Sequence, residues 1–311
     1  MHMKRFYFII FSLLAIGAQA QSLTDGLLMP KGAFCTGFLY MNDSWKDYWE
    51  GSLKRDNANI GTVTTQSVTW MGNYGVTERL NIIAMLPYVK TNLSQGSLTG
   101  YEGLQDISVS AKYRFFAKDF TASGLRFFGV GTFSTPVQDY VIDALPAALG
   151  LGSTNFTGRV TGNYHLESGW YINSSTGYTF RSNVKLDHPS YYTNDHLYNS
   201  DIVEMSNVWD LTTMLGYYKN GLQAEAFYSQ QNTLGGSDIR RQDMPFVSNR
   251  MNFQKVGALV MYYLPVPKGL ALRASYSYTI DGRNVGQSTT YLAGILYTFH
   301  FSKNETITPQ P

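Results

Sequence analysis

Residues Asp106–Phe116 have the sequence DISVSAKYRFF, in which apolar and polar side chains alternate. One set of alternate positions is apolar (Ile107, Val109, Ala111, Tyr113 and Phe115), and the other is polar (Ser108, Ser110, Lys112 and Arg114). Successive side chains of a β-strand point to opposite faces of the sheet. This stretch therefore predicts a strand with one apolar face and one polar face.

The same alternation recurs along the chain and predicts an all-β protein. We expect twelve strands, near residues 32–41, 63–74, 80–90, 105–116, 124–135, 154–165, 169–180, 206–219, 222–233, 252–264, 270–280 and 288–301. The connections between them alternate between short and long. The shortest, Asn220-Gly221, is typical of a type I′ hairpin turn, in which both residues adopt a positive φ.

Alternating short and long connections favour a transmembrane β-barrel over a soluble β-sandwich. Such a barrel has strands of about 9–11 residues or more, and it has short periplasmic turns and long extracellular loops. We therefore predict a single antiparallel transmembrane β-barrel over residues 32–301, embedded in outer-membrane lipid. An even number of strands places both ends of the barrel sequence in the periplasm.

The two ends of the chain indicate export to the bacterial outer membrane. Residues 1–20 carry Lys4 and Arg5, then an apolar stretch and an Ala-Gln-Ala site, which is typical of a cleaved signal peptide. Residues 21–31 are predicted to be a periplasmic segment. We favour a flexible lead-in to the barrel, and the alternative is a plug inserted into its lumen. The aromatic stretch Tyr297–Phe301 is similar to the signal used by the outer-membrane barrel assembly machinery, and residues 302–311 form a tail after it.

Composition excludes several classes of protein. The chain has 24 Lys+Arg against 22 Asp+Glu, and removal of residues 1–20 leaves 22 of each, so a nucleic-acid partner is not expected. Its single cysteine, Cys35, cannot form an internal disulfide or a cysteine-based zinc site. His188, Asp195 and His196 could bind a metal, although a solvated loop is the favoured interpretation. No cofactor and no resident metal are expected.

One part of the sequence resembles a known family. Tyr74-Gly75-Val76-Thr77-Glu78-Arg79-Leu80 is followed by Leu86-Pro87-Tyr88, Gly103-Leu104-Gln105-Asp106 and Ala111-Lys112-Tyr113-Arg114. This order resembles the outer-membrane barrels of the MetA-pathway phenol-degradation family, with the pattern YGLTDRLEL…LPY…GLGDLSLGAKYRL. The resemblance covers about residues 70–130, and Gln105 stands where the pattern often has glycine. It implies a barrel that passes small, often aromatic or hydrophobic, compounds.

Charged and polar side chains on strands are expected to face the lumen, because an Arg or Lys facing lipid at the membrane midplane costs about 2–4 kcal/mol. The candidate lumen-lining residues are Lys112, Arg114, Arg126, Arg159, Asn163, Gln223, Glu225 and Arg273. Basic residues outnumber acidic ones in this set, which would favour anionic permeants. The alternative, which we favour, is that these side chains hydrogen-bond to one another and fill a narrow barrel.

The predicted function is an outer-membrane channel or transporter for small molecules. The alternative is a non-transporting barrel that acts as an adhesin or structural protein through its extracellular loops. Exposed aromatic residues suit that alternative, and they are equally suited to form a constriction: Trp45, Tyr48 and Trp49 in the first loop, and Tyr191, Tyr192 and Tyr198 in the fourth. No pattern of a barrel phospholipase is present, so the protein is not expected to be an enzyme.

Overall fold

The structure is a computed structural model that describes residues 22–240 and 245–301. The predicted signal peptide and the C-terminal tail lie outside the described residues. Among the residues that are described, no helix is long and apolar enough to cross a membrane.

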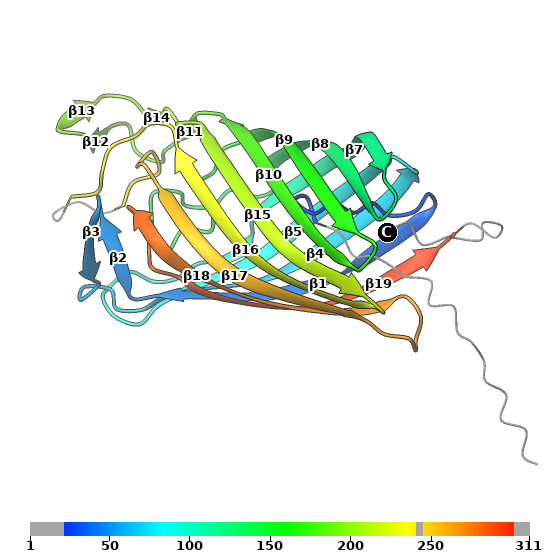
Figure 1. Cartoon of the computed structure of the whole chain (residues 1–311). Helices are drawn as coiled ribbons and strands as arrows, with labels where there is room; N and C mark the ends of the chain where they lie inside the picture. The colour runs from blue at the N-terminus through cyan, green and yellow to red at the C-terminus, as the bar shows by residue number, and fades with distance from the viewer. Residues whose placement is uncertain (1–21, 241–244, 302–311) are drawn as a thin grey trace, which may run out of the picture.

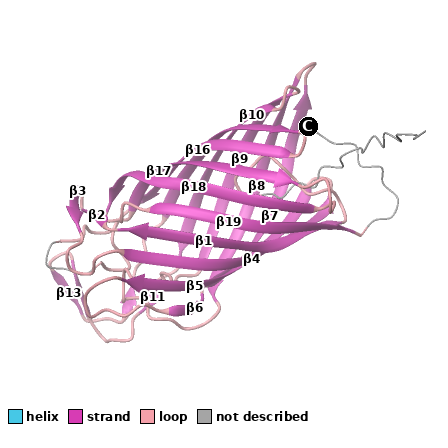
Figure 2. Ribbon diagram, turned by 90° about the horizontal axis from the view of Figure 1, so that it is seen from below, coloured by secondary structure: helices cyan, strands magenta, loops and turns pink. Residues whose placement is uncertain are grey.

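Twelve long antiparallel strands in the described part of the chain form a closed barrel (Figure 1). They are β1 (Ala33–Trp45), β4 (Val63–Thr77), β5 (Leu80–Leu93), β7 (Asp106–Asp119), β8 (Ser123–Pro136), β9 (Asn155–Leu166), β10 (Trp170–Arg181), β15 (Val208–Lys219), β16 (Leu222–Thr233), β17 (Asn252–Tyr263), β18 (Leu270–Arg283) and β19 (Thr289–His300). The barrel closes where β1 pairs with both β4 and β19 (Figure 2). The predicted fold and the predicted strands are therefore confirmed.

Apolar and polar side chains alternate along each strand, so that the outer face of the barrel is apolar and the face toward the lumen is polar. On β9, for example, Phe156, Val160 and Tyr164 are 53%, 50% and 42% exposed on the outer face. Between them, the side chains of Thr161 and Asn163 are buried inside the barrel. Large apolar side chains therefore lie outside and small polar side chains inside, which is the arrangement of barrels of the outer-membrane type.

Short turns lie at one end of the barrel, which we call the short-turn end. Asn220 and Gly221 have φ of 54° and 78°, which confirms the predicted type of hairpin turn. β4 continues past the end predicted at residue 74 and includes Gly75. A Cβ atom on Gly75 would lie 2.1 Å from the carbonyl oxygen of Pro30, so glycine is needed there for a close approach of the backbone of residues 29–30.

Long loops lie at the other end, which we call the long-loop end, and they contain short strands of their own. These are β2 (Asp47–Glu50), β3 (Leu53–Asp56), β6 (Glu102–Leu104), β11 (Val184–Lys185), β12 (Tyr191–Thr193), β13 (His196–Tyr198) and β14 (Ile202–Val203) (Figure 1). Three loops share an apolar cluster that includes Ile142, Val203 and Val247. The loops therefore pack against one another.

The loop aromatic residues have different environments. Trp49 is 6% exposed, whereas Tyr192 is 57% exposed. Tyr191 stacks on Tyr198 and on Phe246, with ring centroids 4.9 and 5.3 Å apart. Tyr191 thus joins the fourth loop to the loop that contains Phe246, whereas Tyr192 and Tyr198, which is 39% exposed, face solvent.

One loop is anchored by a carboxylate, and this anchor predicts a pH dependence. Asp238 accepts hydrogen bonds from Arg283 Nε at 2.7 Å and Asn284 Nδ2 at 2.8 Å. The hydrogen bond from Arg283 and then that from Asn284 lower the pKa of Asp238 to about 2. A carboxylate whose pKa is lowered by folding stabilises the folded loop above its ordinary pKa of about 4, and this stabilisation is lost as the pH falls through about 2.

We therefore expect amide hydrogen exchange in residues 234–240 to stay slow at pH 4 and to accelerate between about pH 4 and pH 2, after correction for intrinsic rates. The Asp238→Asn variant should exchange faster at pH 4 and lose this pH dependence. Identical pH profiles for the two proteins would show that Asp238 does not anchor the loop.

Candidate functional site in the barrel lumen

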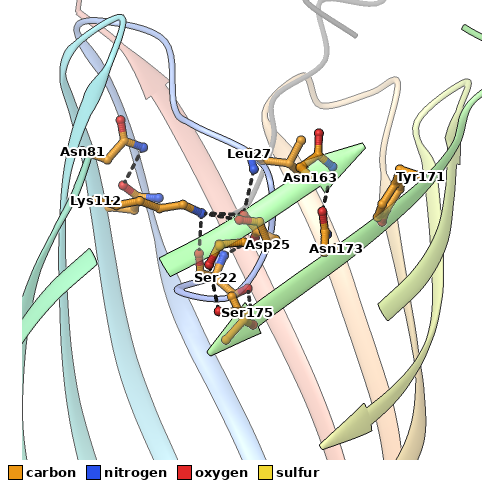
Figure 3. A network of polar contacts seen from close by, with 12 residues as sticks. Ser22, Asp25, Leu27, Asn81, Lys112, Asn163, Tyr171, Asn173 and Ser175 are labelled. Atoms are coloured by element: carbon orange, nitrogen blue, oxygen red, sulfur yellow. Dashed lines mark hydrogen bonds and ion pairs between the residues drawn. The ribbon is translucent and has the colours of Figure 1, made fainter. Parts of the chain in front are cut away.

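Residues Ser22–Met29 lie inside the barrel, and we call them the plug (Figure 3). The segment precedes β1, turns back from the short-turn end and contacts strands on several sides of the lumen. The sequence favoured a flexible lead-in for residues 21–31, and the structure instead has the placement given as the alternative. The sequence signal for this placement is Asp25, an acidic residue that can pair with a lumen cation.

Lys112 on β7 holds the plug. Its Nζ atom donates to the backbone oxygens of Ser22 at 2.9 Å and Asp25 at 2.8 Å, and to Asp25 Oδ1 at 2.7 Å (Figure 3). Lys112 is fully buried, and Asp25 is 4% exposed. An ammonium group has three N–H donors, so all three are used. Breaking one half of such a buried pair leaves an uncompensated charge and costs about 3–5 kcal/mol.

The plug has a compact local fold around Asp25. The Asp25 carboxylate also accepts the backbone N–H of Leu27 at 3.0 Å and that of Ser22. The next residue, Gly26, packs directly on β9. A Cβ atom on Gly26 would lie 2.4 Å from Asn163 Cγ. The plug therefore fits the wall only with a glycine at this position.

Apolar contacts hold the other end of the plug. Met29 is 1% exposed and belongs to a lumen cluster with Leu39, Met71, Met261 and Leu296, among others. This cluster joins the plug to β1, β4, β17 and β19. The plug is therefore fixed to one side of the barrel by Lys112 and to another by Met29.

All eight sequence-predicted lumen residues lie at inward positions of their strands, and each is buried or half-buried. Arg126 and Arg114 each contact a residue of the barrel wall or of a short turn. Arg126 Nη2 lies 2.6 Å from Asp119 Oδ1. Arg114 lies toward the short-turn end, and its Nη2 atom donates to the backbone oxygen of Glu78 at 3.2 Å.

Arg159 and Asp210 form a bidentate pair between β9 and β15, across β10. Arg159 Nη1 lies 2.7 Å from Asp210 Oδ1, and Nη2 lies 2.9 Å from Oδ2. Both side chains are mostly buried. The pair therefore braces the wall with charge-assisted hydrogen bonds, which are stronger than neutral ones.

We expect Asp210→Asn to destabilise the barrel by about 1–3 kcal/mol, because Arg159 loses its counter-charge in a poorly hydrated lumen. The measurement is urea unfolding in phospholipid vesicles, with Asp187→Asn in an exposed loop as the matched control. Exchanging the two charges in the Arg159→Asp, Asp210→Arg double variant should recover part of the loss. Equal stability of Asp210→Asn and the control would contradict a bracing role.

Three of the remaining predicted residues, Asn163, Gln223 and Glu225, belong to two polar groups. Asn163 Nδ2 donates to Asn173 Oδ1 at 2.7 Å on the neighbouring strand β10 (Figure 3). Glu225 Oε1 accepts the Tyr171 hydroxyl at 2.6 Å and Gln223 Nε2 at 2.9 Å. Tyr171 and Asn173 were not among the predicted lumen residues, although the exposed Trp170 and Ile172 alternate with them and so place both at inward positions of β10.

A cavity of about 210 Å³ lies between the plug and the wall formed by β15–β18. The plug contributes Ser22, Thr24 and Asp25 to its lining. The wall contributes charged and polar side chains, including Glu225 and Arg273, and the apolar side chains of Met214, Phe227, Leu259 and Met261. The plugged barrel therefore keeps an internal space of the size of a small molecule.

The structure does not bring together the possible metal ligands in the fourth loop. His188 Nε2 lies 2.9 Å from Asp143 Oδ2, and Asp195 pairs with Arg240. No group of three or more potential metal ligands occurs in the residues that the structure describes. These side chains thus connect loops to one another.

The fold and the lumen define a class of protein. A twelve-stranded antiparallel barrel with an apolar outer face, a polar lumen, short turns at one end and long loops at the other is a β-barrel of the outer-membrane type. The chain belongs to the family described as "Putative MetA-pathway of phenol degradation", whose model matches residues 57–293. This match confirms the resemblance and extends it to most of the barrel.

One solved structure has the same fold. The "COG4313 outer membrane channel from Pseudomonas putida F1" is 14% identical, with a TM-score of 0.68, and the match covers 91% of this chain and 100% of that one. The NanC porin is 9% identical with a TM-score of 0.45, and the match covers 83% and 98% of the two chains. No curated protein matches this sequence.

Proposed function

We propose that the protein is an outer-membrane channel for small molecules that is held closed by its own N-terminal plug. The observation that carries the proposal is the burial of Lys112 against Ser22 and Asp25 inside a closed barrel. A barrel with eight strands is filled by its own side chains, whereas one with 16–18 strands leaves an aqueous channel. Twelve strands leave enough space to accept a peptide segment, and removal of that segment would leave a passage.

The family and the structural relative support the same function. The family description refers to phenol degradation, and the Pseudomonas putida relative is described as an outer membrane channel. Small aromatic or hydrophobic compounds are therefore the permeants that we propose. The short-turn end would face the periplasm, the plug would enter from that side, and the loops would face the exterior.

Single-channel recording in planar bilayers tests the proposal. We expect the mature chain, residues 21–311, to be silent or to open rarely, and a variant lacking Ser22–Leu27 to give frequent discrete conductance steps. The deletion begins after the expected signal-peptide site and leaves Met29 and Pro30 to join β1. Faster migration of the unheated protein in electrophoresis verifies that each barrel is folded. Persistent silence of a folded, inserted deletion variant would contradict the channel function and favour a barrel that acts through its loops.

A further inference from the structure

The cavity behind the plug contains two charged groups with unused binding capacity. Arg273 lines the cavity, and its buried Nε atom has no hydrogen-bond partner among the described residues. Glu225 Oε1 accepts two hydrogen bonds, from Tyr171 and Gln223, whereas Oε2 accepts none from the residues described. The third charged group of the lining, Asp25, is already paired with Lys112.

The register of the strands places these groups on one wall. Gln223 on β16 pairs with Met261 on β17, which pairs with Arg273 on β18. Glu225 lies one inward position further along β16, opposite Leu259. Strands are about 4.8 Å apart, so Glu225 and Arg273 sit on two strands separated by a third that carries apolar side chains. The site is therefore a positive group and a negative group flanking an apolar surface.

Charge balance decides what kind of molecule fits. Arg273 and Glu225 offset each other, as do Lys112 and Asp25, so the cavity carries no net charge before a ligand binds. An anion would pair with Arg273 and leave Glu225 facing a like charge, and a cation would do the reverse. Buried charges are tolerated when each has an opposite partner. A molecule that carries both charges satisfies both groups at once.

Size and lining decide the rest of the molecule. A cavity of about 150 Å³ lined by apolar side chains holds benzene, so 210 Å³ accommodates a compact apolar group together with two small charged groups. Met214, Phe227, Leu259 and Met261 provide the apolar surface for it. Methionine adapts to irregular apolar shapes and makes favourable contacts with rings.

We propose that this cavity binds a small zwitterion with an apolar body, of the type of an apolar α-amino acid. Its carboxylate pairs with Arg273, its ammonium group pairs with Glu225 Oε2, and its side chain lies against the methionine and phenylalanine side chains of β15–β17. This inference goes beyond the permeants proposed above, because it assigns to the cavity a ligand that carries two charges as well as an apolar body. Its role in transport rests on the proposed channel function. Binding itself does not require the channel to open.

Equilibrium dialysis of the mature chain in detergent tests the proposal with a matched series of ligands. The probes are L-leucine, 4-methylpentanoate, which lacks the ammonium group, and 3-methylbutylamine, which lacks the carboxylate. Glycine keeps both charges and lacks the apolar body. We expect saturable binding of leucine, with affinity at least about ten-fold higher than that of each of the other three compounds. Incubation is continued until binding no longer changes, so that slow entry past the plug does not hide the equilibrium.

Two variants and a control assign the binding to the cavity. Glu225→Gln and Arg273→Gln should each weaken leucine binding by about ten-fold or more, whereas Lys268→Gln, in the exposed turn between β17 and β18, should leave it unchanged. Heat-modifiable migration shows that each variant is folded. Arg273→Gln should bind 3-methylbutylamine no more weakly than the parent protein does, because this amine has no carboxylate to pair with Arg273. This measurement shows that the variant has lost one charge and has kept the cavity.

Several results would overturn the proposal. These are the absence of saturable leucine binding, an equal affinity for 4-methylpentanoate or for 3-methylbutylamine, and an equal loss in the Lys268→Gln control. Failure of the zwitterion proposal can be distinguished from failure of the proposed channel function. A deletion variant that conducts while the mature chain binds no leucine refutes the zwitterion alone, and a silent deletion variant with intact leucine binding refutes the channel alone.

Discussion

Replacing Gly26 with valine should open the barrel without removing any part of the plug. A Cβ atom at this position would lie 2.4 Å from Asn163 Cγ and 2.5 Å from Asn163 Cβ. Asn163 cannot move aside at low cost, because its amide nitrogen donates to Asn173 Oδ1 and its side chain is 6% exposed. The valine side chain would therefore force the plug away from β9.

The size of the effect follows from the cost of overpacking. Forcing extra atoms into a well-packed site costs about 1–3 kcal/mol, and about 1.4 kcal/mol is a factor of ten in an equilibrium constant. The displaced plug also loses the contacts of Lys112 with Ser22 and Asp25, which depend on the same position of the segment. We expect the open fraction in planar bilayers to rise by about ten-fold or more.

Gly158 provides a matched control on the same strand. No atom lies within 4 Å of the Cβ position of Gly158, so Gly158→Val should have no effect on conductance. The Gly26→Val barrel should still fold and show heat-modifiable migration, because the strand pairings do not involve Gly26. Equal conductance of the Gly26 and Gly158 variants would show that the fit of the plug against Asn163 does not control opening.

The barrel could be predicted from the sequence because each strand carries its own signal. Alternation in Asp106–Phe116 identifies a strand, its lipid face and its lumen face in a single local pattern, and Asn220-Gly221 identifies a hairpin turn. The same rule placed Lys112, Arg159 and Arg273 at inward positions. These predictions depend on neighbouring residues alone, and a barrel sheet is built from neighbouring strands.

The contents of the lumen could not be predicted in the same way. Residues 22–29 have no periodic pattern, and the contact between Asp25 and Lys112 joins residues 87 apart in the sequence. The position of the plug depends on three-dimensional features. Examples are the close approach of residues 29–30 to Gly75, which has no side chain, and the contact of Gly26 with Asn163. The excess of basic residues suggested a preference for anions, whereas Lys112, Arg126 and Arg159 each have an acidic partner. Three-dimensional pairing leaves Arg273 as a cation available to a ligand.

Replacing Val160 with arginine should be among the most destabilising single changes on the outer face. Val160 is 50% exposed there, and it lies at the middle of β9, paired with Gly129 at the middle of β8 and Thr176 at the middle of β10. If this face contacts lipid, the side chain is near the membrane midplane, where an arginine costs about 2–4 kcal/mol.

A second substitution, closer to the end of the strand, is the control that distinguishes a lipid-facing surface from a water-facing one. Leu166, the last residue of β9, is on the same strand and is 38% exposed. Near an interface the cost of arginine falls to about 0–1 kcal/mol, so Leu166→Arg should unfold close to the parent barrel in urea titrations in phospholipid vesicles. A soluble barrel would tolerate arginine at either exposed position, since surface substitutions change stability by about 0.5 kcal/mol or less. Equal and small effects of the two substitutions on stability would therefore contradict a membrane-spanning barrel. A loss of stability in Val160→Arg alone would place the middle of the strand in hydrocarbon and its end at the membrane surface.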